Sequence, residues 1–258
     1  MGFNIDELYK NEVEAEEKII SFFNQGKIVS LKNACGVLWA KNEVFGIYFL
    51  SIKNLDKSKG YLSICGLLDV YQINNFNSRL LDYGLNHITY ALLSENEELI
   101  QEYGKLRYQR GENAELSMDE MVAEGEMPIW CNTVQYFMVN DIAGVERNLN
   151  IIENKTLKNL PKKEEGLKDD YEFYKALHYK NKPKLEEILE KLVSPKVHKK
   201  RNTNPVLSQY ISHPALGYAK LAWRHGIEVE VDSPLIPKEI LPIRPLNKYE
   251  VPYDFLKQ

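Results

Sequence analysis

The chain has 258 residues, long enough for one large domain or two small ones, and its composition, 44% hydrophobic and 27% charged, is that of an ordinary globular protein. Its formal net charge of -4 at pH 7 argues against a general nucleic-acid binder, because such proteins carry a surplus of Lys and Arg. The most apolar run, 44–50, is far shorter than the ~20 residues of a membrane span, and the acidic N-terminus lacks the apolar core of a secretory signal. We therefore expect a soluble cytoplasmic protein that binds neither nucleic acid nor a membrane.

Helical periodicity dominates the first half of the chain. Asp6 is expected to cap the first helix, because its carboxylate can accept a hydrogen bond from a free N–H group of the first turn, and Gly26 is expected to end it. Two very apolar segments, 29–40 and 44–52, are compatible with core helix or strand, and we assign helices because neither alternation nor turn residues indicate a hairpin. The helices expected in this half cover about residues 6–24, 29–40, 44–52, 58–71, 78–93 and 97–108.

A common plan recurs three times in the middle of the chain: an apolar helix, a tight turn with an asparagine, and an amphipathic helix. The turn asparagines are Asn96, Asn140 and Asn181, and their spacing suits stacked helical hairpins. The alternative is that antiparallel helix pairs of ordinary length look alike. The sequence thus predicts an all-α fold of antiparallel helical hairpins, stacked in a repeat-like array or merely alike in plan, with a short extended C-terminal segment.

Three polar breaks interrupt the helices, and they bear on how the chain is divided. We expect one helical domain over residues 1–258; the alternative is two lobes, 1–154 and 167–258, linked near 155–166. A further break, 193–205, carries a basic run that is expected to be a solvated loop rather than a nucleic-acid contact.

The remaining break, between Gly111 and Pro128, is the best candidate for a charged site. No Lys or Arg occurs between Arg110 and Arg147. The acidic segment can be a solvated loop, a docking surface whose charge would steer a basic partner, or a metal or acid–base site. A metal site would need further oxygen ligands that nothing in the sequence specifies, so no metal is predicted. The carboxylates of this segment are Glu112, Glu115, Asp119, Glu120, Glu124 and Glu126.

Signatures of catalysis are absent from the sequence. It has no glycine-rich phosphate loop, no zinc-protease motif, no nucleophile elbow and no Cys/His cluster with metal-ligand spacing. The three cysteines, Cys35, Cys65 and Cys131, are far apart in apolar surroundings, which is typical of buried thiols in a reducing compartment. His87 lies within an apolar helix, where a structural role is expected. We therefore predict neither an enzyme nor a cofactor.

The stretch from His213 to Leu241 combines three structural signals. Small and apolar residues first recur at helical spacing, and Gly226 then stands where a helix would stop. Residues 227–231 alternate apolar and acidic side chains, which predicts an extended segment. The prolines at 234 and 237 disfavour an immediate return to helix.

This order of features resembles the C-terminal signature of the immunity protein 49 family, which comprises immunity proteins of bacterial polymorphic and secreted toxin systems. The resemblance implies a mainly helical protein that binds a cognate toxin, as in type VI secretion or contact-dependent competition, and neutralises it by occluding its active site. It brings no catalytic residues, and its signature positions are expected to be structural. The alternative is a helical-repeat scaffold for another protein partner. The residues that fit the signature are Gly217, Ala219, Ala222, Arg224, Gly226, Glu230, Ser233, Pro237 and Leu241.

The resemblance also bears on the acidic segment. The cognate toxin is expected to be basic if it acts on nucleic acid, and an acidic surface would complement it. Among the carboxylates of 112–126 we therefore expect the residues that bind the toxin.

Overall fold

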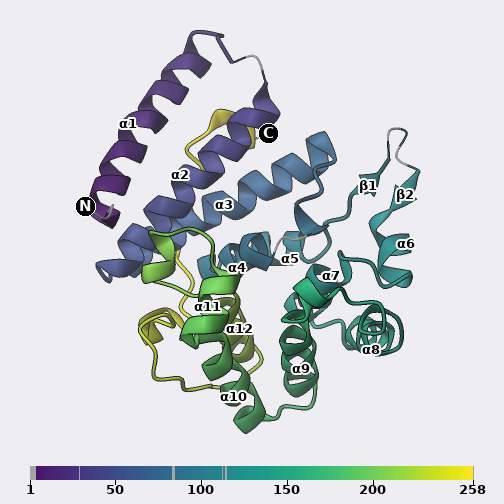
Figure 1. Ribbon diagram of the computed structural model, residues 1–258. Coiled ribbons are helices and arrows are strands. Elements are labelled where there is room, and N and C mark those ends of the chain that lie inside the picture. The colour runs from purple at the N-terminus through teal and green to yellow at the C-terminus, as the bar shows by residue number, and fades with distance from the viewer. Residues whose placement is uncertain (1–3, 29, 83–84, 112, 114, 258) are drawn as a thin grey trace.

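The computed structural model describes residues 4–28, 30–82, 85–111, 113 and 115–257, and this part of the chain is almost entirely helical (Figure 1). The all-α prediction is confirmed. The α-helices are α1 (Ile5–Asn24), α2 (Leu31–Ser51), α3 (Leu55–Phe76), α4 (Leu85–Ser94), α5 (Glu97–Tyr103), α6 (Met118–Ala123), α7 (Ile129–Met138), α8 (Ile142–Ile151), α9 (Leu167–His178), α10 (Lys182–Val193), α11 (Pro195–Arg201) and α12 (His213–Arg224). Two strands of two residues each, β1 (Gln109–Arg110) and β2 (Leu116–Ser117), pair in antiparallel orientation.

The prediction of separate helices over 29–40 and 44–52 is wrong, because α2 runs without a break from Leu31 to Ser51. Two of the polar residues that suggested an interruption, Lys41 and Asn42, have buried side chains that bind partners in other parts of the chain. Lys41 forms an ion pair with Glu12 of α1, and the amide of Asn42 donates to the hydroxyl oxygen of Tyr253 at 2.7 Å. Since α2 packs against α1, α3 and the C-terminal segment, apolar residues occupy several of its faces and hide its helical period.

Other predicted helix boundaries also shift. The side chain of Asn4, rather than Asp6, caps α1 by accepting from the N–H of Glu7 at 2.8 Å. The helix expected over 78–93 is a short 3-10 turn followed by α4, and residues 83–84 lie outside the described residues. The helix expected over 97–108 ends at Tyr103, and the break expected over 193–205 contains α11.

The helical hairpins share one turn geometry. The last residue before each second helix is an Asn or Asp that caps it, and the residue before that cap adopts a left-handed conformation with φ between 54° and 60°. This turn joins α2 to α3, α4 to α5, α7 to α8, and α9 to α10. The left-handed residues are Lys53, Glu95, Asn140 and Lys180, and the capping residues are Asn54, Asn96, Asp141 and Asn181.

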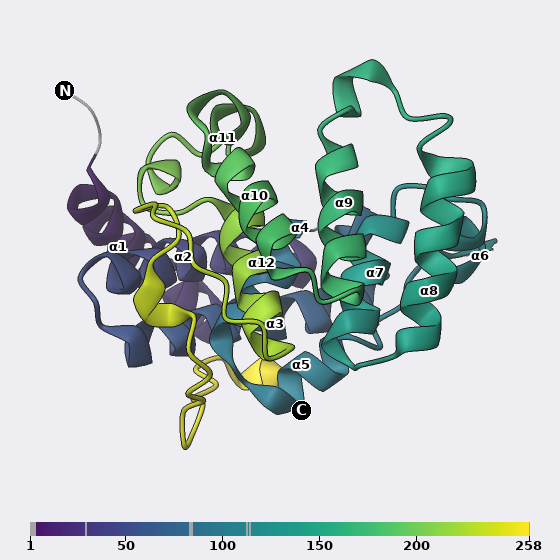
Figure 2. The ribbon, with the colours of Figure 1, turned by 90° about the horizontal axis from the view of Figure 1, so that it is seen from below.

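The hairpins do not form a purely linear stack, because α12 returns to pack along α4 (Figure 2). Gly217 allows this close approach, since a Cβ atom there would lie 3.0 Å from the Cβ of Thr89 and closer still to its hydroxyl oxygen. The main cluster of buried apolar side chains extends from Ile5 to Leu241 and includes residues of both expected lobes. The division of the chain into one domain or two stays a prediction.

The C-terminal stretch follows its sequence pattern. Gly226 has a φ of +75° and ends α12, and the next N–H group, of Ile227, donates to the carbonyl of Ala222 at 2.9 Å. Side chains then alternate between buried and exposed over 227–231, but this extended segment joins no strand pair in the described part of the chain. None of the described helices has both the length and the apolar character needed to cross a bilayer.

Candidate functional site

The acidic segment lies at one edge of the molecule, on β2, α6 and the turn after α6 (Figure 1). The first turn of α6 is held by a capping box. The Ser117 hydroxyl accepts from the N–H of Glu120 at 3.2 Å, and the Glu120 carboxylate accepts from the N–H of Ser117 at 2.8 Å. Hydrogen bonds from the hydroxyl and then the N–H of Ser117 lower the pKa of Glu120. Glu120 therefore serves the helix end, and the Ser-x-x-Glu spacing would have indicated this.

Three further carboxylates of the segment form ion pairs within the chain. Their cations come from just before and well after the segment. Carboxylates that have few Lys or Arg residues near them in the sequence therefore have such residues beside them in the fold. All three carboxylates remain substantially exposed, at 60% for Asp119, 73% for Glu124 and 44% for Glu126. The pairs are Asp119 with Arg107 at 2.8 Å, Glu124 with Lys155 at 3.3 Å, and Glu126 with Arg110 at 3.3 Å.

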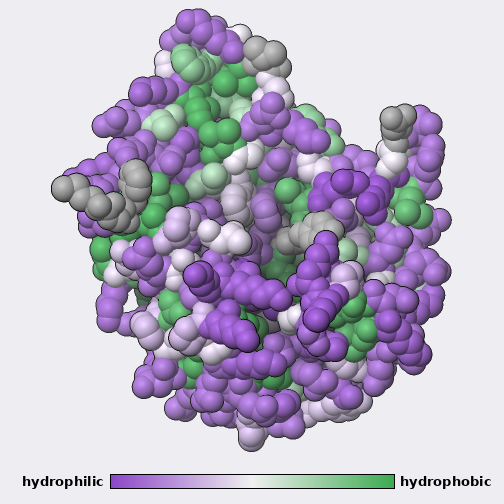
Figure 3. All heavy atoms as spheres, viewed as in Figure 1, coloured by the Kyte–Doolittle hydropathy of each residue, from purple (hydrophilic) through white to green (hydrophobic). Residues whose placement is uncertain are grey.

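The other two residues of the predicted site contribute less to this geometry. Glu115 is exposed near the β1–β2 turn and accepts from the side-chain amide of Asn113 at 3.1 Å. Glu112 lies outside the described residues. We name the surface formed by Glu115, Asp119, Glu120, Glu124 and Glu126 the acidic face, and Figure 3 shows that the edge carrying α6 is mostly hydrophilic.

A groove of about 520 Å³ runs along the acidic face, between the turn after α6 and the segment 155–164. Glu124 and Glu126 line it together with cationic side chains, and Met127, Pro128 and Leu160 supply apolar surface. Exposed ion pairs contribute only about 0–1 kcal/mol, so an incoming cation could displace Lys155 or an incoming carboxylate could replace Glu126 at little cost. The groove thus combines exchangeable charges of both signs with the apolar surface of Met127, Pro128 and Leu160.

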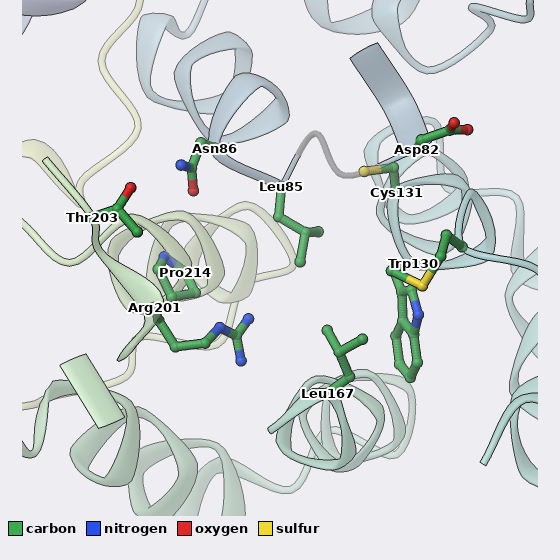
Figure 4. A pocket seen from close by; sticks show the side chains of 10 residues that line it. Asp82, Leu85, Asn86, Trp130, Cys131, Leu167, Arg201, Thr203 and Pro214 are labelled. Atoms are coloured by element: carbon green, nitrogen blue, oxygen red, sulfur yellow. The ribbon is translucent and has the colours of Figure 1, made fainter. Parts of the chain in front are cut away.

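A second cavity, of about 280 Å³, lies between α4, α7, α9, α11 and α12 (Figure 4). Figure 4 shows Arg201, Leu167 and Leu85 projecting into the same space. The guanidinium of Arg201 is held by the buried carboxylate of Asp170 through two hydrogen bonds of 2.8 and 2.9 Å. No histidine occurs among the described residues that line this cavity. The described lining therefore does not place a histidine base beside a nucleophile, the arrangement of Ser-His and Cys-His acyl transfer.

Histidines instead join buried networks between helices. His213 contacts the hydroxyl of Tyr90, and its other ring nitrogen lies 3.1 Å from the amide oxygen of Asn202. His87 lies 2.9 Å from the carboxylate of Asp69. These contacts fix α4 against α12 and α3, which agrees with the structural role expected for His87. Among the described residues, no three His, Cys, Asp or Glu side chains converge to form a metal site.

The small residues of the C-terminal signature occupy the helix–helix contact and the helix end. Ala219 and Ala222 are fully buried on α12, Gly217 lies against Thr89, and Gly226 ends the helix. Arg224 donates from its guanidinium to Glu97 of α5 at 2.7 Å.

The later signature residues hold the extended segment. The backbone N–H of Glu230 donates to the Glu186 carboxylate of α10 at 2.8 Å, while its own side chain is exposed. Ser233 and Pro237 line a depression beside the end of α2, and Leu241 is buried. No signature residue lines the groove along the acidic face or the cavity into which Arg201 projects.

Comparison with known protein families gives a match over most of the chain. The family model of immunity protein 49 matches residues 66–240, which include the second half of α3 and all of α4 to α12. No curated protein and no solved structure matches the chain. The family match extends far upstream of the C-terminal signature that first indicated it. The chain belongs to the immunity protein 49 family.

Proposed function

We propose that this protein binds a cognate bacterial toxin and neutralises it in the cytoplasm by covering the toxin's active site, without catalysing a reaction itself. The family match carries this proposal, because the family comprises immunity proteins. The secretion route of the toxin belongs to the same proposal: type VI secretion or contact-dependent competition.

We further propose that the acidic face contacts the toxin. Its carboxylates are exposed, and their ion pairs within the chain are of the exposed kind that exchanges partners at little cost. A basic toxin surface would be steered toward these carboxylates and could replace Arg107 or Lys155 as their partner. The groove beside Glu124 and Glu126 supplies the apolar surface that a stable interface also needs.

Co-expression with the toxin encoded in the neighbouring reading frame tests the function. We expect the protein to restore growth of cells that produce the toxin and to co-purify with it. The alternative, a helical-repeat scaffold for another partner, is favoured by the turn geometry that four hairpins share. A scaffold of that kind would neither rescue growth nor bind the toxin.

Charge reversal tests the acidic face. The double variant Asp119→Lys/Glu124→Lys should weaken toxin binding at least tenfold, or about 1.4 kcal/mol, in calorimetry of the purified pair. We exclude Glu120 from the variant because its carboxylate holds the capping box. The matched control is Glu14→Lys/Glu17→Lys, which makes the same charge change on exposed positions of α1, at the opposite end of the molecule (Figures 1 and 2). Equal affinities for both double variants would remove the acidic face from the interface.

A further inference from the structure

A basic pocket adjoins the acidic face on the side of α3. It lies between the C-terminal end of α3, the turn that follows and β1 (Figure 1), and its volume is about 700 Å³. Three cationic side chains line it: Lys32, Arg79 and Arg110. The described residues of its wall include no carboxylate. In a chain of net charge -4, such a local surplus of positive charge favours an anionic ligand.

Ser78 supplies an independent sign of a missing partner. This residue lines the basic pocket and is only 6% exposed, yet its hydroxyl oxygen has no hydrogen-bond partner. A buried polar group without a partner costs about 1–3 kcal/mol, so such groups are rare in folded proteins. A hydroxyl beside three cations can donate to an oxyanion, which would satisfy both the hydroxyl and the positive charge.

The walls of the basic pocket are held in place before any ligand arrives. The side-chain amide of Asn77 donates to the carbonyl of Gln109 at 2.8 Å, and its oxygen accepts from the N–H of Gln109 at 2.6 Å. This pair of hydrogen bonds ties the turn after α3 to β1. Arg79, two residues after Asn77, and Arg110, directly after Gln109, are thereby kept beside the same pocket.

The two arginines also link the basic pocket to the groove. The Nε of Arg79 lies 3.8 Å from the Asp82 carboxylate, and Arg110 pairs with Glu126. Both carboxylates line the groove and not the basic pocket. Because each arginine is already partly neutralised from the groove side, the remaining charge suits a singly charged carboxylate better than a phosphate.

We propose that the basic pocket takes an acidic side chain of the toxin, bound by Lys32, Arg79, Arg110 and the Ser78 hydroxyl, next to the toxin's basic residues on the acidic face. This inference rests on the proposed function and specifies its interface: the toxin must present a carboxylate beside its basic surface. Such a bipolar pattern would reject proteins that are merely basic, because they would place a cation against the arginines.

Ser78→Ala is the sharpest test with the toxin encoded in the neighbouring reading frame. Loss of a hydrogen bond to a charged group should weaken toxin binding about tenfold, while the melting temperature of the free protein stays the same or rises, because an unsatisfied hydroxyl is removed. The double variant Lys32→Gln/Arg79→Gln should weaken binding further. Its matched control is Lys10→Gln/Lys18→Gln on exposed positions of α1, which should bind as the unchanged protein does.

A second measurement tests the basic pocket without the toxin. Sodium acetate should shift the backbone amide resonances of residues 78 and 109 more than sodium chloride of equal ionic strength. In Ser78→Ala this acetate-specific shift should vanish at both positions. The absence of an acetate-specific shift, or unchanged toxin affinity in Ser78→Ala and in Lys32→Gln/Arg79→Gln, would overturn this inference. If the unchanged protein fails to bind the toxin at all while acetate still binds, the proposed function fails and the basic pocket stands.

Discussion

Lys220 of α12 and Glu95 of the α4–α5 turn form an ion pair in which both side chains are fully buried. The Glu95 carboxylate also accepts from Lys59 of α3 at 2.9 Å and from the N–H of Arg244 at 2.7 Å. The Lys220 ammonium donates further to the carbonyls of Ile240 and Leu241, at 2.7 and 3.0 Å. Burial lowers the pKa of Lys220 to about 8 although Glu95 opposes the shift, so the ammonium form still prevails at neutral pH. This cluster joins three helical elements to the C-terminal segment.

Removing the carboxylate of this cluster should be among the most destabilising single changes. Glu95→Gln leaves two buried ammonium groups without their counter-charge, and we expect a loss of about 3–5 kcal/mol in the free energy of unfolding. Lys220→Met should cost less, because Lys59 then still neutralises Glu95. Urea unfolding followed by circular dichroism measures both. Glu97→Gln, two residues away, is the control: its carboxylate is 57% exposed in the pair with Arg224, so the change should alter stability by less than about 1 kcal/mol. Equal losses for Glu95→Gln and Glu97→Gln would contradict the role of the cluster.

The contact between α4 and α12 should tolerate no added methyl group. Gly217→Ala would place a Cβ atom against Thr89, and overpacking of this kind typically costs about 1–3 kcal/mol. Gly36→Ala is the matched control, since a Cβ there meets no atom within 4 Å and alanine favours a helix. Thermal unfolding should therefore show a lower midpoint for Gly217→Ala and a higher one for Gly36→Ala. Two midpoints that shift in the same direction would refute the close crossing.

Two histidines should titrate on opposite sides of the ordinary value. Burial alone would lower the pKa of His87, but the carboxylate of Asp69 outweighs it and the net pKa is raised, whereas burial lowers the pKa of His225. His87 therefore stabilises the fold fully below its unfolded pKa of about 6.5, and this contribution is lost as the pH rises through the higher folded value. NMR titration of the ring protons measures both residues. In Asp69→Asn, the pKa of His87 should fall below that of the unchanged protein, and an unaltered titration would contradict this account.

The shared hairpin turn offers a stabilising substitution. A left-handed conformation costs a side chain with a Cβ atom about 1–2 kcal/mol, and glycine avoids this cost while losing part of the gain to its greater freedom when unfolded. Lys180→Gly should therefore raise the free energy of unfolding by about 0.5–1 kcal/mol. Asn140→Gly should raise it less, because asparagine tolerates this conformation. The control Glu187→Gly, on an exposed position within α10, should lower it by about 1 kcal/mol. A stability loss in Lys180→Gly would argue against the turn geometry.

The sequence predicted the elements whose signals are local. The period of α10, the stop at Gly226 and the alternation over 227–231 each depend on neighbours a few residues away, and each occurs as predicted. The unbroken α2 was missed because Lys41 and Asn42 look like a break until their distant partners are known. Helix α11 was missed because its polarity resembles that of a loop.

The candidate site was predicted only in outline for the same reason. The sequence located its carboxylates, but their cations, such as Arg107 and Lys155, come from other elements and could not be paired from spacing. The unpartnered hydroxyl of Ser78 is visible only once the turn after α3 has been folded against β1. Charge along the sequence thus located the carboxylates, but not the mixed sign of the surface that they share with their cations.

The packing of the C-terminal segment against α1 and α2 also means that these helices wait for a late partner during synthesis. The hydroxyl of Tyr253 contacts Glu16 and Asn42, which precede it by 237 and 211 residues. At a synthesis rate of about 5–20 residues per second, Glu16 waits on the order of 10 to 50 s for this partner to leave the ribosome. A nascent chain must therefore keep its first helices from aggregating until almost the whole of this sequence has been translated.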